Sequence, residues 1–409
     1  MRTTAPETSR RAHEVVPAHG GRSRARRFLA WTSVVALLLV GLFYAGGGWY
    51  FAGQIRDEVT VTAPQRTLDL TVVATTDDSV TLEARDGEAP AALESSLVHG
   101  LDWDGGYGQV EELEGVDGDQ VTRAFTLLAG ETPAAGDAAR LTKEAFPDPQ
   151  LALDVPVEDV TFESDGRTLP AWFAPGQGTT WAILVHGKGV TRSELLRLMR
   201  TTTDLGFPSL NMAYRRDPET GGGLIRFGQD EWPDLEAAVR YALDHGAERA
   251  VLVGCSSGGA ISASFLENSE LADRAVAAVF DAPMLDFGAT VSHGAADRTL
   301  PLVGTEIPSS LVWVAQRLAD LRFDMDAARS NYLDDTDWLT VPTLVFHGTE
   351  DQTVPYTVTE RLDAAAPELV DHLLVDGADH VESWNADPES YDARVRDFLE
   401  DYAPVSPGD

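Results

Sequence analysis

The sequence predicts a protein of the α/β class, in which helices cover both faces of a mostly parallel, doubly wound sheet. From about residue 157 onward, short runs rich in Val, Ile and Leu alternate with segments of helical periodicity, as expected for parallel strands joined by right-handed crossovers. Within this region, Gly254-Cys-Ser-Ser-Gly258 separates the apolar run Ala250–Val253 from a stretch of small residues. This G-x-S-x-G pattern is typical of a sharp strand-to-helix turn that exposes a serine hydroxyl.

The chain begins with a basic segment followed by a long apolar run. Residues 1–27 contain seven arginines and two glutamates, and residues 28–55 form an uncharged run of 28 residues. This run is longer than the roughly 20 residues that span a bilayer and the 7–15 of a signal-peptide core. It predicts a transmembrane anchor. A cleaved signal peptide is the alternative, because glycines at 46–48 weaken the end of the helix.

The distribution of charge around this run predicts its orientation. Positive residues stay on the cytoplasmic side, whereas Arg56-Asp-Glu58 on the other flank is net negative. We therefore expect a single-pass protein of the cell membrane with a cytoplasmic N-terminus and an extracytoplasmic main part. The one cysteine, Cys255, excludes an intrachain disulfide, which a large exported domain does not need.

The composition argues against several classes of partner. The formal net charge is −35 at pH 7, which disfavours nucleic acid because phosphate binding needs clustered Lys and Arg. The sequence has neither the His and Cys spacing of a metal site nor a Gly-rich phosphate loop, so no metal and no cofactor are expected. No pattern indicates the oligomeric state.

Residues 56–150 are predicted to form a small β-rich region or spacer. Short runs enriched in β-branched residues are separated by turns rich in Gly and Asp. The runs expected to form strands are Val59–Thr62, Leu68–Val73, Ser79–Glu83 and Gln120–Leu127.

Residues 151–405 are predicted to form the main domain. It should open with a hairpin of strands 157–163 and 167–173, because Ser164-Asp-Gly166 is a strong turn signal. The alternation of strands and helices breaks at about 286–339, where a helix is expected at Ser309–Arg322. The aromatic residues of this insertion are expected either to line a pocket or to pack in its core; they are Trp313, Phe323 and Trp338.

The serine of the turn, Ser256, needs chemical partners, because a hydroxyl near its free pKa is a poor nucleophile. A histidine that takes its proton and a carboxylate that orients the histidine are the usual solution. Two later strand ends offer them: Asp351 follows the run Pro342–Phe346, and His380 follows His372–Val375. Asp281 is the alternative candidate for this carboxylate, because it ends the predicted strand 275–280 that follows the serine turn.

Several of these motifs together resemble those of α/β-hydrolases, especially serine aminopeptidase-like and Bem46-like members, over residues 157–402. The similar segments are His347-Gly-Thr-Glu-Asp351-Gln-Thr-Val-Pro355, Gly377-Ala-Asp-His380, Ile183-Leu-Val-His186-Gly-Lys-Gly189 and Phe227-Gly-Gln-Asp-Glu-Trp-Pro-Asp-Leu-Glu-Ala-Ala-Val239. The resemblance implies the α/β-hydrolase fold, with residues 286–339 as a cap over the site.

The resemblance also implies roles for individual residues. Ser256 would be the nucleophile, His380 the base and Asp351 the acid, while the backbone N–H groups of Ser257 and Lys188 would form the oxyanion hole. The Lys188 side chain is expected to face solvent.

The implied function is a serine hydrolase that cleaves a carboxylic ester, with a small-molecule or lipid-like acyl substrate and no cofactor. A serine peptidase of the aminopeptidase type, and a non-catalytic binding protein on the same fold, are the alternatives.

Overall fold

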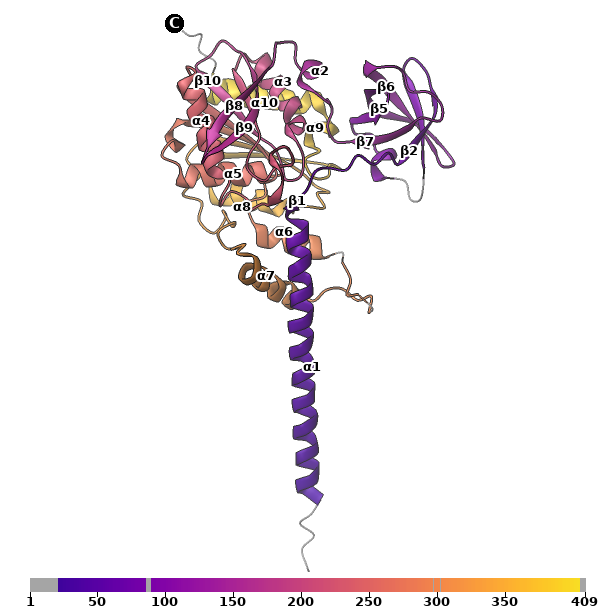
Figure 1. The fold of residues 1–409 in the computed structure, drawn as a ribbon, viewed down its shortest axis with the longest axis vertical. Coiled ribbons are helices and arrows are strands. Elements are labelled where there is room, and N and C mark those ends of the chain that lie inside the picture. The colour runs from indigo at the N-terminus through magenta and orange to yellow at the C-terminus, as the bar shows by residue number, and fades with distance from the viewer. Residues whose placement is uncertain (1–20, 86–89, 297, 302, 405–409) are drawn as a thin grey trace, which may run out of the picture.

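The computed structural model describes residues 21–85, 90–296, 298–301 and 303–404. It begins with helix α1 (Gly21–Glu58), whose N-terminal half extends away from the rest of the molecule (Figure 1). The part from Arg26 to Glu58 is long and apolar enough to cross a membrane, a test that signal sequences also pass. The predicted apolar segment 28–55 lies within this helix. The predicted basic tail up to residue 20, and position 405 at the end of the main domain, lie outside the described residues.

The C-terminal half of α1 packs along α7 (Ser309–Phe323). Gly47 and Gly48 allow this close approach, because a Cβ atom at either position would meet side chains of α7. Tyr44 and Ser310 also share a hydrogen bond of 2.7 Å between their hydroxyls. Helix α1 is therefore fixed to the globular part through the region predicted as an insertion.

Residues 70–142 form a closed antiparallel β-barrel, seen beside the main domain in Figure 1. Its core is apolar, with Leu70, Val72, Leu82 and Leu101 fully buried. The strands in barrel order are β2 (Leu70–Thr75), β3 (Ser79–Ala84), β6 (Gln120–Gly130), β5 (Gly106–Asp117), β4 (His99–Trp103) and β7 (Ala138–Thr142).

One strand predicted for this β region belongs elsewhere. The run 59–62 contains β1 (Thr60–Val61), which pairs with β12 (Gly223–Leu224) in a separate two-stranded sheet. The reason is local: Val59 follows α1 directly, and its carbonyl accepts a hydrogen bond from the Ile225 backbone N–H at 3.2 Å. The segment after α1 is thus fixed to the main domain before the barrel begins.

The main domain contains an eight-stranded sheet whose central strands are parallel. The strands β9 and β8 at one end are antiparallel to their neighbours and form the predicted hairpin. The strands in sheet order are β16 (Val370–Val375), β15 (Thr343–Gly348), β14 (Ala275–Asp281), β13 (Arg249–Cys255), β10 (Thr180–Val185), β11 (Ser209–Met212), β9 (Arg167–Ala174) and β8 (Glu158–Ser164).

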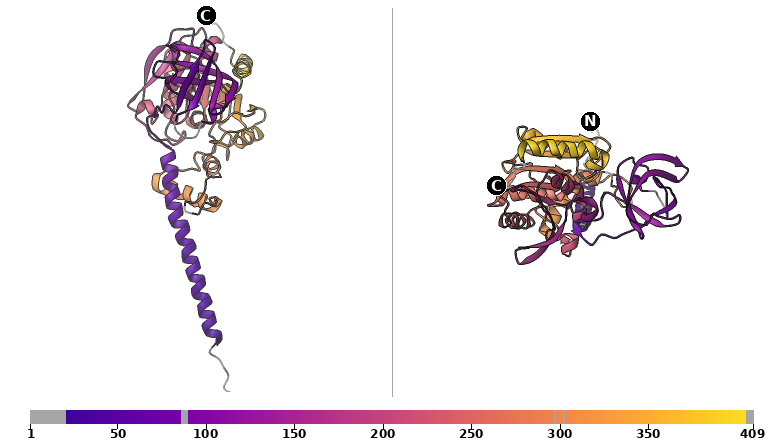
Figure 2. Two further views of the ribbon diagram at one scale, coloured as in Figure 1. Left: turned by 90° about the vertical axis from the view of Figure 1, so that its right-hand side faces the viewer. Right: turned by 90° about the horizontal axis from the view of Figure 1, so that it is seen from above.

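Each face of this sheet has its own hydrophobic core, because the central strands are buried on both sides. Helices α4 (Trp232–Asp244), α5 (Ser257–Asn268) and α8 (Thr357–Ala365) contribute to one core. The other core contains residues of α3 (Leu196–Asp204), α9 (Ser383–Ala386) and α10 (Pro388–Tyr402). Figure 2 shows α10 along one face of the sheet in the view from above.

The insertion at 286–339 contains α6 (Phe287–Ala296) and α7, which lie next to α1. None of its three aromatic candidates is among the described residues that line the two hollows beside α1. Trp338 is buried and donates a hydrogen bond to the Tyr332 carbonyl at 2.8 Å, Phe323 packs against the core under Arg322, and Trp313 is 59% exposed. Trp313 points outward because Val312 and Ala315 occupy the inner face of α7.

Candidate active site

Ser256 lies at the turn between β13 and α5, as the G-x-S-x-G pattern predicts. Its backbone has φ 50° and ψ −115°, a conformation that L-residues rarely adopt outside functional sites. A Cβ atom at residue 258 would collide with the Val185 carbonyl of the neighbouring strand, so only glycine allows this turn to pack on the sheet. The strained turn presents the Ser256 hydroxyl at the carboxyl end of the sheet.

His380 joins Ser256 to Asp351. Its Nε2 lies 2.9 Å from Ser256 Oγ, and its Nδ1 lies 2.7 Å from Asp351 Oδ2. The two loops that carry His380 and Asp351 follow the adjacent parallel strands β16 and β15. Because Nδ1 faces a carboxylate, the ring carries its proton there, and Nε2 is free to accept a proton from the serine.

The Asp351 carboxylate is held by several donors. Its Oδ1 accepts the backbone N–H groups of Thr353 at 2.8 Å and Val354 at 2.7 Å, and its Oδ2 also lies 3.2 Å from His347 Nε2. Burial opposes ionisation of Asp351, but the hydrogen bonds and charges of His347 and His380 outweigh it and hold the pKa below the usual value. Asp351 is therefore ionised at neutral pH.

Asp281, the rival acid, makes no hydrogen bond to His380 among those of the described residues. Its Oδ1 accepts the Ser383 hydroxyl at 2.8 Å, and its Oδ2 lies 3.9 Å from the Arg197 guanidinium. Burial raises the pKa of Asp281, while Arg197 and Ser383 oppose this rise. Its contacts connect the end of β14 to α3 and to the start of α9, which is a structural arrangement.

The two amides predicted for the oxyanion hole belong to the first residue of α5 and to the loop after β10. Ser257 is the first residue of α5, where a helix N–H has no carbonyl partner within the helix and the helix dipole is positive. Lys188 lies in the loop after β10, and the preceding Gly187 approaches Ser256 so closely that its own Cβ would contact the serine Cβ at 3.3 Å. The loop residue before Lys188 is thus next to Ser256, and the role of the two N–H groups stays a prediction.

The prediction that the Lys188 side chain faces solvent is wrong. Its Nζ donates a hydrogen bond of 2.7 Å to the Glu58 carbonyl, at the last residue of α1. Burial lowers the pKa of Lys188, and the charge of Glu58 partly opposes this. The sequence contains no sign of this contact, because its two residues are 130 positions apart.

Other reactive side chains near the site are occupied by structural contacts. Cys255 is fully buried, and burial raises the pKa of its thiol well above the usual value, so it stays protonated. His186, Asp217 and Glu219 are close enough to bind a metal ion. However, His186 Nε2 contacts Asp217 at 3.2 Å, and Glu219 pairs with Arg192 at 2.9 Å.

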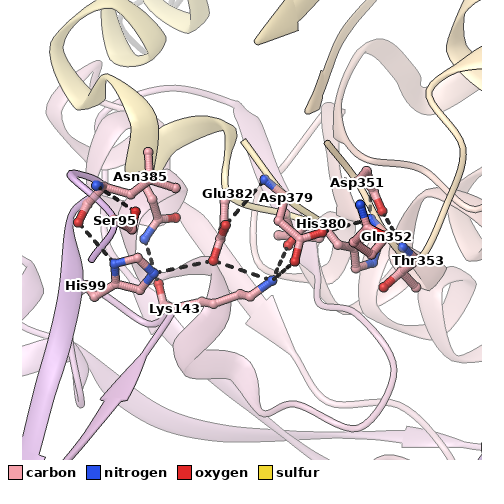
Figure 3. Close-up of polar contacts among 12 residues, drawn as sticks. Ser95, His99, Lys143, Asp351, Gln352, Thr353, Asp379, His380, Glu382 and Asn385 are labelled. Carbon is pink, nitrogen blue, oxygen red and sulfur yellow. Dashed lines mark hydrogen bonds and ion pairs between the residues drawn. The ribbon is translucent and has the colours of Figure 1, made fainter. Parts of the chain in front are cut away.

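The barrel contacts the loop of His380, which sequence reasoning missed (Figure 3). Lys143, just after β7, donates a hydrogen bond of 3.0 Å to the His380 carbonyl and lies 3.5 Å from Asp379 and from Glu382. His99 of β4 lies 3.4 Å from the same Glu382 carboxylate. The β region therefore supports the loop that carries the histidine.

A cavity of about 260 Å³ lies between the end of α1, the helices α6 and α7, and the loops of the site. Lys188, Gln352 and Thr353 form its wall on the side of the catalytic loops. Its apolar wall includes Phe51, Ile55, Phe227, Phe287, Val291 and Val312.

Comparisons of sequence give remote relatives only. No protein-family profile matches the chain. The uncharacterized protein YqkD of Bacillus subtilis is 24% identical over 231 residues, which cover 56% of this chain and 73% of that protein. The uncharacterized protein YfhR of Salmonella typhimurium is 24% identical over 258 residues, covering 59% and 80% respectively.

Comparisons of structure establish the fold. An esterase of Pyrococcus furiosus matches with a TM-score of 0.50 and 19% identity, over 62% of this chain and 95% of that one. A puromycin-hydrolyzing peptidase of Mycobacterium tuberculosis matches with a TM-score of 0.51 and 16% identity, over 85% of this chain and 56% of that one. Together with the eight-stranded sheet and the turn at Ser256, these matches show that the chain has the α/β-hydrolase fold.

Proposed function

We propose that the protein is a serine hydrolase that cleaves carboxylic esters by acyl transfer to Ser256. The observation that carries this proposal is the bridge formed by His380, whose ring nitrogens lie 2.9 Å from the Ser256 hydroxyl and 2.7 Å from the Asp351 carboxylate. This is the arrangement that turns a weak hydroxyl into a nucleophile.

The reaction follows from these contacts. His380 Nε2 accepts the hydroxyl proton as Ser256 Oγ attacks the ester carbonyl, and the N–H groups of Ser257 and Lys188 stabilise the oxyanion. The imidazolium then gives its proton to the leaving alkoxide. Water, deprotonated by His380, attacks the acyl-enzyme and releases the acid, while the Asp351 carboxylate holds the imidazole in the required tautomer throughout.

The cavity favours an ester over a peptide. An aminopeptidase needs an acidic group that binds the substrate ammonium, and Glu58 is the one carboxylate in the described lining of this cavity. It lies 3.8 Å from Arg298, in a wall that is otherwise largely apolar. A peptidase is the second candidate, because the likeness to the puromycin-hydrolyzing peptidase extends over 85% of this chain.

We further propose that α1 anchors the enzyme in the cell membrane with its N-terminus in the cytoplasm and the hydrolase outside. The basic residues before Phe28 and the acidic pair at 57–58 support this orientation.

The decisive comparison is between serine variants assayed on p-nitrophenyl esters and aminoacyl-anilides. Ser256→Ala should lower kcat by several orders of magnitude, because the members of such a triad act as a unit. Ser262→Ala, which removes a buried hydroxyl on α5 that donates to the Gly258 carbonyl, is the control. If Ser256→Ala keeps a tenth of the wild-type turnover, the assignment is wrong. Preferential cleavage of anilides would favour the peptidase.

A further inference from the structure

The cavity beside the active site adjoins a second apolar hollow along α1. This second hollow lies between Leu39, Leu42 and Phe43 of α1 on one side and Leu300, Pro301 and Leu311 of the insertion on the other. Phe51 lines both hollows, and the adjacent α7 residues Leu311 and Val312 line one each. The apolar side chains of the two hollows therefore adjoin at Phe51 and extend from the middle of α1 to the wall that holds Lys188, Gln352 and Thr353; this lining is called the path below.

The position of this path along α1 corresponds to one half of a bilayer. At 1.5 Å per residue, a hydrocarbon core of about 30 Å takes up about 20 residues. Counted from Phe28, the first residue after the basic segment, the core ends near Gly47. Residues 39–43 of the second hollow then lie at the depth of the outer-leaflet acyl chains, and Phe51 lies about 6 Å above their end.

The surface of the insertion supports the same placement. Val303, Trp313 and Leu321 are 67%, 59% and 82% exposed, which makes them the most exposed large apolar side chains outside α1 in the described part of the chain. All three lie in the insertion that packs against α1, and Trp49 and Tyr50 of α1 are also exposed. Exposed apolar side chains gathered in one region indicate a contact surface, and aromatic residues concentrate at the membrane interface.

Two contacts fix this region to the catalytic loops. The Lys188 ammonium holds the end of α1 through the Glu58 carbonyl, and His293 Nε2 of α6 lies 2.8 Å from the Asp351 carbonyl. The path is thus attached both to the oxyanion loop and to the acid loop.

We propose that the substrate is an acyl-ester lipid of the membrane itself, whose acyl chain passes from the outer leaflet along α1 into the cavity. This inference rests on the proposed function, since Ser256 Oγ must form the bond to the acyl carbon. The bond from that carbon to the lipid alkoxide breaks, His380 protonates the alkoxide, and water releases a fatty acid that returns to the bilayer.

The full-length protein in vesicles tests this proposal. The vesicles contain dioleoyl phosphatidylglycerol, dioleoyl phosphatidylethanolamine and dioleoylglycerol, and release of oleate is compared with cleavage of soluble p-nitrophenyl acetate. The wild type should release oleate in a manner that depends on Ser256. Cleavage of the acetate without oleate release would overturn the lipid proposal and leave the esterase intact, whereas failure on both esters would overturn the esterase as well.

A matched pair of variants tests the path. Ala295→Trp fills the cavity from α6, whereas Ala296→Trp adds the same side chain to an exposed neighbour on that helix. Ala295→Trp should lower oleate release at least tenfold and change acetate turnover less than twofold, while Ala296→Trp should change neither. Gly294→Leu is a milder second block, because a Cβ atom there meets nothing within 4 Å. Equal loss on both esters for Ala295→Trp and Gly294→Leu would contradict the path.

Photocrosslinking gives a readout that needs no turnover. A diazirine-bearing oleoyl phosphatidylglycerol is irradiated in vesicles with the Ser256→Ala protein. Labelled peptides should include residues 287–296 and 308–323 in addition to α1, and Ala295→Trp should reduce the label on 287–296. Label confined to residues 28–43 of α1 would show that lipid does not enter the cavity.

Discussion

Residue 256 has a φ of 50°, in a backbone conformation that costs about 1–3 kcal/mol for a side chain other than glycine. Ser256→Gly should therefore be more stable than Ser256→Ala by about 1 kcal/mol, since only glycine relaxes at this φ and ψ. Chemical unfolding of both variants in detergent measures the difference. At Ser262, inside α5, the order should reverse, because alanine is the better helix former. The same order at both positions would show that the turn is not strained.

The contacts of the two buried aspartates predict opposite effects on catalysis. Asp351→Asn should lower kcat by about 10⁴-fold, because an amide stabilises the wrong histidine tautomer. Asp281→Asn should keep most of the turnover, because Asp281 contacts Ser383 and Arg197 rather than the histidine. Steady-state kinetics on one soluble ester compare the two variants. A larger loss in Asp281→Asn would move the acid to residue 281.

The depressed pKa of Asp351 predicts acid sensitivity. A carboxylate whose folded pKa lies below its unfolded value stabilises the fold above about pH 4, and this contribution is lost as the pH falls toward the folded pKa. The wild type should therefore lose more unfolding free energy than Asp351→Asn between pH 5 and pH 3. Denaturant titrations across this pH range measure the unfolding free energy of both proteins. The same loss of free energy in both would contradict the lowered pKa of Asp351.

At the scale of elements, the contact between the barrel and the His380 loop predicts a positioning role for Lys143. Lys143→Met should lower kcat about 3–10-fold with little change in KM, because a slightly displaced base reacts poorly once substrate is bound. Lys143→Arg should restore much of the loss. Arg140→Gln, which removes an ion pair with Asp102 on the neighbouring strand, is the control. If Lys143→Met and Arg140→Gln behave alike, the contact is only structural.

The elements that the sequence predicts well are those whose burial pattern is regular. The turn at 254–258, the hairpin with β9 at Arg167–Ala174 and the helix at Ser309–Phe323 agree with the expected segments within about one residue. The strand β5 escaped prediction because its second half, rich in Glu and Gly, is mostly exposed. The strand β5 forms because it pairs with β6, and no local sequence pattern reveals this pairing.

The candidate site also contains residues whose position the sequence predicts and contacts that it does not predict. Ser256, Asp351 and His380 follow strands, so their position at one edge of a parallel sheet could be predicted from spacing. The Lys188 contact with α1, the Lys143 contact with His380 and the pocket walls depend on segments that meet only in the folded chain. The residue type makes Trp313 a candidate for a pocket wall, but its side chain lies on the exposed face of α7.

At the scale of the whole molecule, α1 and the insertion form one unit, because α1 packs along α7 and the Arg322 guanidinium stacks 3.5 Å from the Trp49 ring centre. The full-length protein should therefore remain in the membrane fraction after a carbonate wash, and protease added to the outer face should remove the hydrolase. A soluble mature form that begins near residues 46–53 would show that the apolar segment is a cleaved signal.

The central claim is that acyl transfer passes through Ser256, and trapping the acyl-enzyme tests it most directly. During turnover of p-nitrophenyl butyrate, rapid acid quenching and peptide mass spectrometry should detect a butyryl adduct on the peptide that contains Ser256, together with a burst of p-nitrophenol close to one equivalent if deacylation limits the rate. The adduct should be absent from Ser256→Ala. Butyrate release at the wild-type rate by Ser256→Ala, with no adduct at residue 256 in the wild type, would contradict the account.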